Sequence, residues 1–190
     1  MRVLVDANVL FPKTTRDWLS LLYGNGGNRM FHVFWTEDIL TEVLYRLRRK
    51  HPSMDGGSLR DVHDKIVATF EVGRVEDYNP ATFVPDLADQ NDAHVKAAAV
   101  ACQADILLTC DKGFTNSTDD LFEVYHPDDF FLLVADSNPS LVEQVVRLQV
   151  NYWRGKSGEA DLPRALRNAD CPQFAERVRE ILQAMPTQLL

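Results

Sequence analysis

Four acidic residues stand next to segments that are expected to form strands or helices: Asp6, Glu42, Asp92 and Asp111. Asp6 directly follows an apolar segment, 2–5, and Asp111 comes one residue after a second such segment, 106–109. Ligands bind beyond the carboxyl ends of strands in open α/β sheets. If these two strands are neighbours, the two aspartates meet at one edge of the sheet.

Carboxylates that share one cleft repel each other and raise one another's pKa. A hard divalent cation removes that cost, and Mg²⁺ or Mn²⁺ prefers oxygen ligands. Such an ion can activate water and stabilise charge on a phosphate undergoing displacement. The pattern therefore suggests a metal-dependent phosphodiesterase. Two of these acids also have a purely structural interpretation. Asp6 could cap a turn, and Glu42 could be the surface partner of Arg46, four residues further on.

The elements that would position these acids alternate between strand and helix. We expect strands at 2–5, 31–35, 106–109 and 122–125, an extended segment at 72–75, and helices at 14–22, 37–50, from 58 and from about 92. The expected caps are Thr14 or Thr15, Thr36, Ser58, and Asn91 or its neighbour. This alternation predicts the α/β class, with a three-layer α/β/α sandwich around a central, mostly parallel sheet.

The character of the sequence changes after Pro127, where only helices are expected, at 130–134, 139–153, 162–168 and 172–185. In the second of these, Leu141, Val145, Leu148 and Tyr152 recur at helical spacing, with Val142, Val146 and Gln149 alongside. We therefore expect two domains, 1–126 and 127–190, the second a C-terminal helical extension.

Composition limits the function classes. The 190 residues carry a net charge of −8, which argues against a bulk nucleic-acid coat protein. No apolar run approaches the roughly 20 residues of a membrane span, and Asp6 interrupts the first apolar run, unlike a signal peptide. The three cysteines show no CxxC pair, which disfavours a disulfide framework or a zinc site. We expect a cytoplasmic protein.

Four motifs resemble the acidic motifs of PIN-domain nucleases, in that family's order and at its usual separations. They are Val-Leu-Val-Asp-Ala-Asn-Val-Leu (3–10), Thr-Glu-Val-Leu (41–44), Asn-Asp-Ala-His-Val-Lys-Ala-Ala-Ala (91–99) and Leu-Thr-Cys-Asp-Lys-Gly-Phe (108–114). The resemblance covers about residues 1–126. The tail, which begins His-Pro-Asp-Asp-Phe (126–130), resembles the C-terminal domain of a subgroup of bacterial VapC-like toxins.

The resemblance implies an Mg²⁺- or Mn²⁺-dependent endoribonuclease that hydrolyses RNA phosphodiester bonds, the toxin of a type II toxin–antitoxin pair. Asp6, Glu42, Asp92 and Asp111 would be the catalytic residues and metal ligands, supported by Asn8, Thr109 and Asp89. Relatives often carry more acids in the loop where this chain has Asn91, so the number of metal ions stays open. The implied partners are an RNA substrate and a cognate antitoxin protein, and the family also suggests a homodimer.

Two further features have competing interpretations. Arg46, Arg48, Arg49 and Lys50 form the densest basic cluster, which is either a solvated helix end or a track for RNA phosphates. His94 is either a general base or a residue that packs near the sheet end.

Two alternative functions also remain. One is a PIN-like module that binds RNA or protein without catalysis. The other is a haloacid-dehalogenase-like phosphatase, which also begins with Asp after its first strand but wants Asp-x-Asp where this chain has Asn8.

Overall fold

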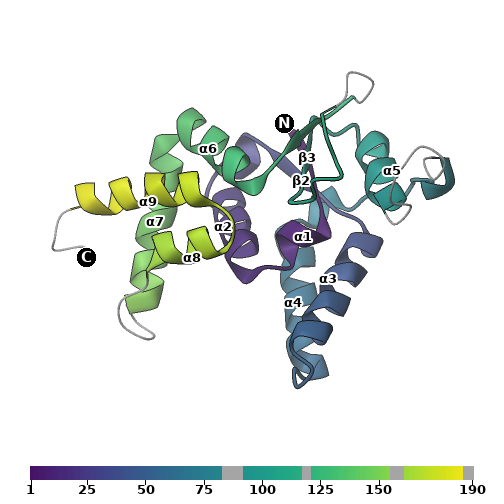
Figure 1. Cartoon of the computed structure of the whole chain (residues 1–190), viewed down its shortest axis with the longest axis horizontal. Coiled ribbons are helices and arrows are strands. Elements are labelled where there is room, and N and C mark those ends of the chain that lie inside the picture. Colours follow the sequence, from purple (N-terminus) through teal and green to yellow (C-terminus); the bar gives the residue numbers. More distant parts are fainter. Residues whose placement is uncertain (83–91, 117–120, 155–160, 186–190) are drawn as a thin grey trace. The chain divides into compact units, whose positions relative to one another are not determined.

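The computed structural model describes residues 1–82, 92–116, 121–154 and 161–185 (Figure 1). The chain divides into two compact units. The first combines Met1–Phe11 with Met30–Tyr125, and the second combines Pro12–Arg29 with His126–Leu190. The sequence-based division into domains 1–126 and 127–190 stays a prediction, because compact units do not establish which segments fold on their own.

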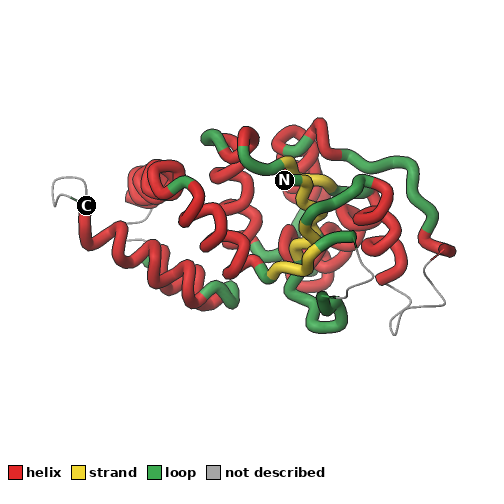
Figure 2. The backbone as a smooth tube through the Cα atoms, turned by 90° about the horizontal axis from the view of Figure 1, so that it is seen from above, coloured by secondary structure: helices red, strands yellow, loops and turns green. Residues whose placement is uncertain are grey.

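The first unit is built on a parallel sheet of four strands in the order β2-β1-β3-β4. The strands are β1 (Arg2–Val5), β2 (His32–Phe34), β3 (Ile106–Leu108) and β4 (Glu123–Tyr125). β1 is central and pairs with β3 so that Val5 lies opposite Leu108. Both strands are almost entirely buried and apolar, as strands of a covered parallel sheet are. The α/β class with a parallel sheet is therefore confirmed (Figure 2).

Four α-helices accompany this sheet among the described residues: α1 (Ala7–Leu10), α3 (Glu37–Lys50), α4 (Gly56–Thr69) and α5 (Ala93–Ala101). Two short 3₁₀ helices, η2 (Glu71–Gly73) and η3 (Pro80–Thr82), lie between α4 and α5. The expected cap of α3 is confirmed, because the Thr36 hydroxyl accepts a hydrogen bond from the Ile39 amide at 3.1 Å. The expected cap of α4 was wrong. The Asp55 carboxylate binds both the amide and the hydroxyl of Ser58, so the helix begins two residues before Ser58.

The segment after η2 extends the sheet edge by one bridge. The Trp35 amide donates to the Gly73 carbonyl at 3.0 Å, and the Val75 amide donates to the Trp35 carbonyl at 2.9 Å. A Cβ atom on Gly73 would lie 1.7 Å from the Val33 carbonyl oxygen, so this close approach requires glycine. The extended segment expected at 72–75 is therefore shorter than predicted. Residues 72 and 73 belong to η2, and Arg74 forms an isolated parallel bridge with Trp35.

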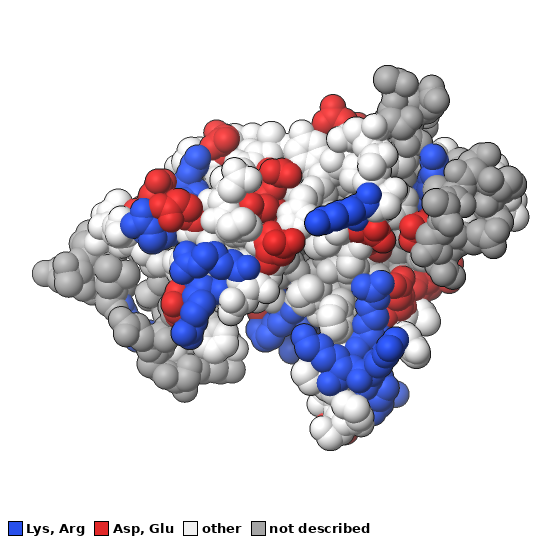
Figure 3. Space-filling model, in the orientation of Figure 1, with Lys and Arg blue, Asp and Glu red and all other residues white. Residues whose placement is uncertain are grey.

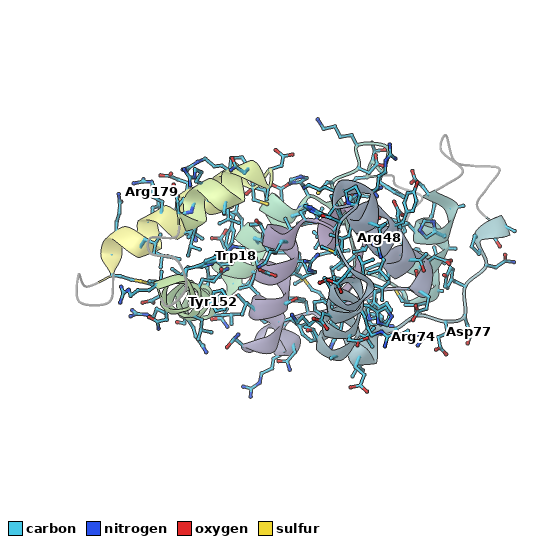
Figure 4. All side chains as sticks on the ribbon, turned by 90° about the horizontal axis from the view of Figure 1, so that it is seen from below. Trp18, Arg48, Arg74, Asp77, Tyr152 and Arg179 are labelled. Carbon is cyan, nitrogen blue, oxygen red and sulfur yellow. The ribbon has the colours of Figure 1, made fainter. Side chains whose placement is uncertain are left out.

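The second unit consists of helices α2 (Lys13–Gly24), α6 (Pro127–Ser137), α7 (Pro139–Arg154), α8 (Leu162–Asn168) and α9 (Pro172–Ala184), with a short 3₁₀ helix η1 (Gly27–Arg29). An aromatic cluster holds α2, α6 and α9 together: the Phe174 ring lies 5.0 Å from Trp18 and 5.1 Å from Phe131 between centroids. Figure 4 labels Trp18, where α2 faces the C-terminal helices.

Three local expectations in this unit need correction. α2 begins at Lys13 after Pro12, which has no side-chain cap; Thr15 lies inside the helix and donates to the Pro12 carbonyl. α6 is longer than expected because His126 caps it and Pro127 starts it. The buried face of α7 consists of Leu141, Val142, Val145, Val146 and Gln149, whereas Leu148 and Tyr152 are exposed. In the described part of the chain, no helix has both the length and the apolar character needed to cross a membrane.

Candidate active site

Asp6 lies where β1 ends, at the carboxyl edge of the sheet. Its amide still pairs with the β3 strand, donating to the Leu108 carbonyl at 3.0 Å. Its side chain turns back to cap α1, and Oδ1 accepts the Ala7 amide at 2.5 Å. Asp6 is only 6% exposed, so its carboxylate is held in a nearly dry position.

Asn8 and Thr109 fix the second oxygen of this carboxylate. Asp6 Oδ2 accepts the Thr109 hydroxyl at 2.7 Å and the Asn8 amide group at 2.5 Å. The same Asn8 nitrogen lies 2.9 Å from Thr109 Oγ1, and Asn8 Oδ1 accepts the Cys110 backbone amide at 2.8 Å. The side chains that follow β1 and β3 thus form one hydrogen-bonded network around Asp6.

The pKa of Asp6 is raised above its ordinary value of 3.8, chiefly because burial disfavours the charged carboxylate. The hydrogen bonds from Thr109 and Ala7 oppose this rise. The negative charge of Glu42 adds to it, and the positive charge of Arg46 subtracts from it. A cation beside Asp6 would therefore favour the ionised carboxylate.

Glu42 approaches the site from α3. One of its carboxylate oxygens pairs with Arg46 at 2.5 Å, and the other lies 4.0 Å from Nε2 of His94. The Glu42 side chain is 31% exposed, so it lies at the border between core and solvent, as helical spacing predicted. The surface pair with Arg46 is present, and it coexists with the electrostatic effect of Glu42 on Asp6.

Asp111 and Asp92 come together around Gly113. The Asp111 amide donates to Thr109 Oγ1 at 3.0 Å, which ties Asp111 to the Asp6 network through its backbone. Its carboxylate turns outward and accepts the Gly113 amide at 2.7 Å. A Cβ atom on Gly113 would lie 3.1 Å from an Asp111 oxygen and 3.9 Å from an Asp92 oxygen. Asp92 directly precedes Ala93 at the start of α5, with helical backbone angles and no side-chain capping bond, so it lies at the helix start as expected.

The comparisons with known proteins agree with this geometry. The sequence profile of the PIN domain matches residues 2–113, which is more than half of the chain and includes all four acids. The chain belongs to the PIN-domain family. A second profile, that of the VapC50 C-terminal domain, matches residues 127–180. This protein is therefore a VapC-like PIN protein with a C-terminal extension, as the motifs indicated.

Members of the PIN family are usually nucleases. Searches of the curated proteins and of the solved structures found no match to the chain.

The first unit, Met1–Phe11 with Met30–Tyr125, is called the PIN unit below. It brings the predicted site residues together in two groups rather than in one. Asp6, Asn8 and Thr109 form the buried network with Glu42 nearby, while Asp92 and Asp111 flank Gly113. Across the described ranges, no group of three or more His, Cys, Asp or Glu side chains could hold a metal ion. Asp89 and Asn91 lie outside the described residues. The carboxylate, hydroxyl and amide oxygens of these residues nevertheless suit a hard cation.

The basic cluster lies on the second half of α3 in the PIN unit. Figure 3 shows Lys and Arg gathered over the α3–α4 hairpin. Arg46 pairs with Glu42, Arg48 donates to the Met54 carbonyl, and the Lys50 ammonium lies 5.2 Å above the Phe11 ring. Arg48, Arg49 and Lys50 are exposed, and they occupy the last turn, where the helix dipole favours cations.

Sequence reasoning missed two features of this site. It did not anticipate α1, whose first amide binds Asp6 Oδ1. It also did not anticipate that Asn8 joins the two strand ends by binding Asp6, Thr109 and the Cys110 amide. The available signal was the position of Asn8, two residues after Asp6, where an amide can both donate and accept.

Proposed function

We propose that this PIN protein is a metal-dependent endoribonuclease that hydrolyses RNA phosphodiester bonds. The observation that carries the proposal is the state of Asp6. A nearly buried carboxylate at the carboxyl edge of the central strands accepts three hydrogen bonds, yet it has a raised pKa. Perturbed carboxylates in clefts cluster at functional sites, and a cation bound beside Asp6 would favour its ionised form.

Asp6, Glu42, Asp92 and Asp111 would hold Mg²⁺ or Mn²⁺. When bound, such an ion supplies an activated water and stabilises charge on the phosphate. Thr109 and Asn8 keep the Asp6 carboxylate in one orientation, because both donate to the same oxygen. Glu42 is paired with Arg46, and that pair would have to open for both Glu42 oxygens to face a bound ion.

The basic cluster on α3 would position the RNA. Phosphate contacts fix a nucleic acid in place without reading its sequence. Arg48, Arg49 and Lys50 are exposed on the helix that also carries Glu42, so a strand bound along them would run toward that carboxylate.

The match to the VapC50 C-terminal domain supports a role as the toxin of a type II toxin–antitoxin pair. The implied partner is a cognate antitoxin protein, which would keep the nuclease inactive until it is removed. A homodimer and a cytoplasmic location belong to the same proposal.

One observation favours a second candidate, a PIN-like module that binds RNA or protein without cleaving it. The described residues hold no group of three acids close enough to share an ion. In that case the raised pKa of Asp6 would only reflect burial.

The deciding experiment measures RNA cleavage with Mn²⁺, with Mg²⁺ and with a chelator, in the wild type and in Asp6→Asn. We expect metal-dependent cleavage, lost by more than about 100-fold in Asp6→Asn, since even outer partners of metal ligands cost 10–100-fold. The matched control is Asp105→Asn, an exposed aspartate at the opposite end of β3 that accepts the Arg2 amide. Full activity in folded Asp6→Asn, or cleavage that persists without metal, contradicts the proposal.

A further inference from the structure

The helical unit contains a pocket of about 400 Å³ between α2, α7 and α8. That volume lies within the range of about 300–1,000 Å³ that small-ligand sites occupy. Trp18 from α2 and Gln149 and Trp153 from α7 line it, together with charged residues from α2 and α8. None of these residues belongs to the acidic site of the PIN unit.

Gln149 is the unusual residue of this pocket. It is 8% exposed, and its Nε2 has no hydrogen-bond partner among the residues that the structure describes. A buried amide donor without a partner costs about as much as a lost hydrogen bond, so natural proteins rarely keep one without reason. Because Gln149 lines the pocket, a ligand that brings a hydrogen-bond acceptor would satisfy it.

The pocket also presents flat aromatic surface. Trp153 is half-buried, and its ring makes an edge contact with Tyr152, with the two ring centroids 5.3 Å apart. Figure 4 labels Tyr152, the preceding residue on α7, and Trp18 on α2. The Lys13 ammonium lies 5.8 Å from the Trp153 ring centroid, near the outer limit of a cation–π contact, and its side chain is mostly exposed. A flat ligand can therefore displace it at low cost.

The pocket is lined by two basic and two acidic side chains, so their formal charges sum to zero. Lys13 pairs with Asp17 on the same helix, and Arg164 pairs with Asp161 at 3.6 Å. Each cation thus has a carboxylate that an incoming anion would have to displace. This arrangement disfavours a free phosphate or an acidic peptide and favours an uncharged, planar ligand.

We propose that this pocket binds an unpaired nucleobase. A nucleobase offers a π-face for Trp153 and an edge of donors and acceptors for the Gln149 amide, which is how proteins read unstacked bases. The base could come from a free nucleotide or from an RNA strand, and the two sources share this chemistry. The inference does not depend on cleavage, because it concerns binding by a separate set of residues.

The test uses the full chain carrying Asp6→Asn, in chelator, so that RNA stays intact. Adenosine, guanosine, cytidine and uridine are titrated by calorimetry, and six-nucleotide RNAs of A, C or U by fluorescence anisotropy. We expect at least one nucleoside to bind, and the oligonucleotides then show whether the same base also binds within an RNA strand. Trp153→Leu should weaken that binding about 5- to 150-fold, the range measured for base–aromatic stacking. Gln149→Met, which keeps the shape but removes the amide, should weaken it about 3- to 10-fold.

Gln144→Met is the matched control, because Gln144 is exposed on the same helix and binds Asn25 outside the pocket. It should bind as its parent does. Gln149→Met should also keep or raise the melting temperature, since it removes a buried donor that has no described partner. A purely structural role for Gln149 predicts a lower melting temperature instead.

Three results would overturn the inference. One is that no nucleoside and no oligonucleotide binds in a manner sensitive to Trp153→Leu and Gln149→Met. The second is that inorganic phosphate competes as well as the nucleoside does, which would make this an anion site. The third is that raising salt from 50 to 200 mM abolishes nucleoside binding. Binding of nucleosides without oligonucleotides identifies a free nucleotide as the source, and binding of both identifies RNA. Cleavage by the wild type is measured separately, so loss of either proposal leaves the other standing.

Discussion

Asp6 and Asp128 are both buried carboxylates, one in each unit, and they are held in different ways. Asp6 is 6% exposed and Asp128 is 4% exposed. Asp128 lies in the first turn of α6 and accepts the backbone amides of Gln173 at 3.1 Å and Phe174 at 2.7 Å. These amides open α9, whose own N-cap residue, Cys171, makes no side-chain capping bond.

Asp128 therefore serves as the missing cap of α9, supplied from another helix. Its negative charge faces the positive end of a helix dipole, so that burial is compensated by the fold itself. Asp6 also caps a helix, but α1 has only four residues and supplies one amide. Its other donors are the side chains of Thr109 and Asn8, and the negative charge of Glu42 lies close enough to raise its pKa.

The difference separates two uses of a buried acid. A carboxylate that accepts the first backbone amides of a packed helix, as Asp128 does, stabilises the fold. A buried carboxylate whose pKa is raised despite its hydrogen bonds, as at Asp6, is a candidate ligand for a cation. Three experiments can break or sharpen this distinction.

The largest expected effect on stability is at Asp128. Asp128→Ala leaves two backbone amides at the start of α9 without their acceptor, which should lower the free energy of unfolding by about 2–4 kcal/mol. Urea denaturation measures this loss. Asp129→Ala, at the exposed neighbouring position in the same turn, is the control and should change stability by less than about 0.5 kcal/mol. Equal losses in the two variants would show that Asp128 is not a cap.

Next in size is the response to metal. A ligand at 100 times its dissociation constant stabilises the folded state by about 2.7 kcal/mol. Mn²⁺ or Mg²⁺ should therefore raise the melting temperature of the wild type, and Asp6→Asn should blunt that rise. Asp128→Asn should start from a lower melting temperature and keep the full rise. If millimolar Mn²⁺ changes the melting temperature of neither the wild type nor the two variants, the free protein does not bind the metal. That result would favour the non-catalytic candidate.

Much of the sheet and its edge was predictable from local pattern. The continuous apolar runs at 3–5 and 106–108 indicated buried parallel strands. The acids after them predicted a shared edge, which the β1–β3 pairing confirms. Thr36 before a periodic apolar helix was a recognisable cap. By contrast, α1 was missed because Ala7–Leu10 is too short to show helical periodicity. Asp55 was missed because Gly56 and Gly57 read as a turn rather than as a first helical turn.

The remaining features depend on contacts between distant parts of the chain. Asp128 caps a helix that starts 44 residues later, and nothing in the spacing of either segment announces that pairing. The same holds for α2, which packs with the C-terminal helices although it follows α1 in sequence. Gln149 looked like an ordinary residue beside an apolar stripe until the helices around it defined a pocket. Such roles are set by tertiary packing, which a single sequence does not record.

The smallest expected effect concerns pH, because the hydrogen bonds from Thr109 and Ala7 offset part of the cost of burying Asp6. A carboxyl group whose pKa is raised on folding stabilises the protein fully below its unfolded pKa, near 3.8, and loses that contribution as pH rises through the folded value. In chelator, the stability of the wild type relative to Asp6→Asn should therefore fall as pH rises above about 4, toward neutral pH. Parallel urea titrations across this range measure the difference.

Two variants sharpen this result in opposite directions. Thr109→Val removes a hydrogen bond that lowers the pKa of Asp6, so the fall should extend to higher pH. Glu42→Gln removes a negative charge that raises the pKa of Asp6, so the loss of stability should be complete at a lower pH. Adding Mn²⁺ should shrink the fall, because a bound cation favours the ionised carboxylate. A difference between wild type and Asp6→Asn that does not change with pH would mean that the hydrogen bonds of Asp6 offset the cost of its burial, and the distinction drawn between the two acids would fail.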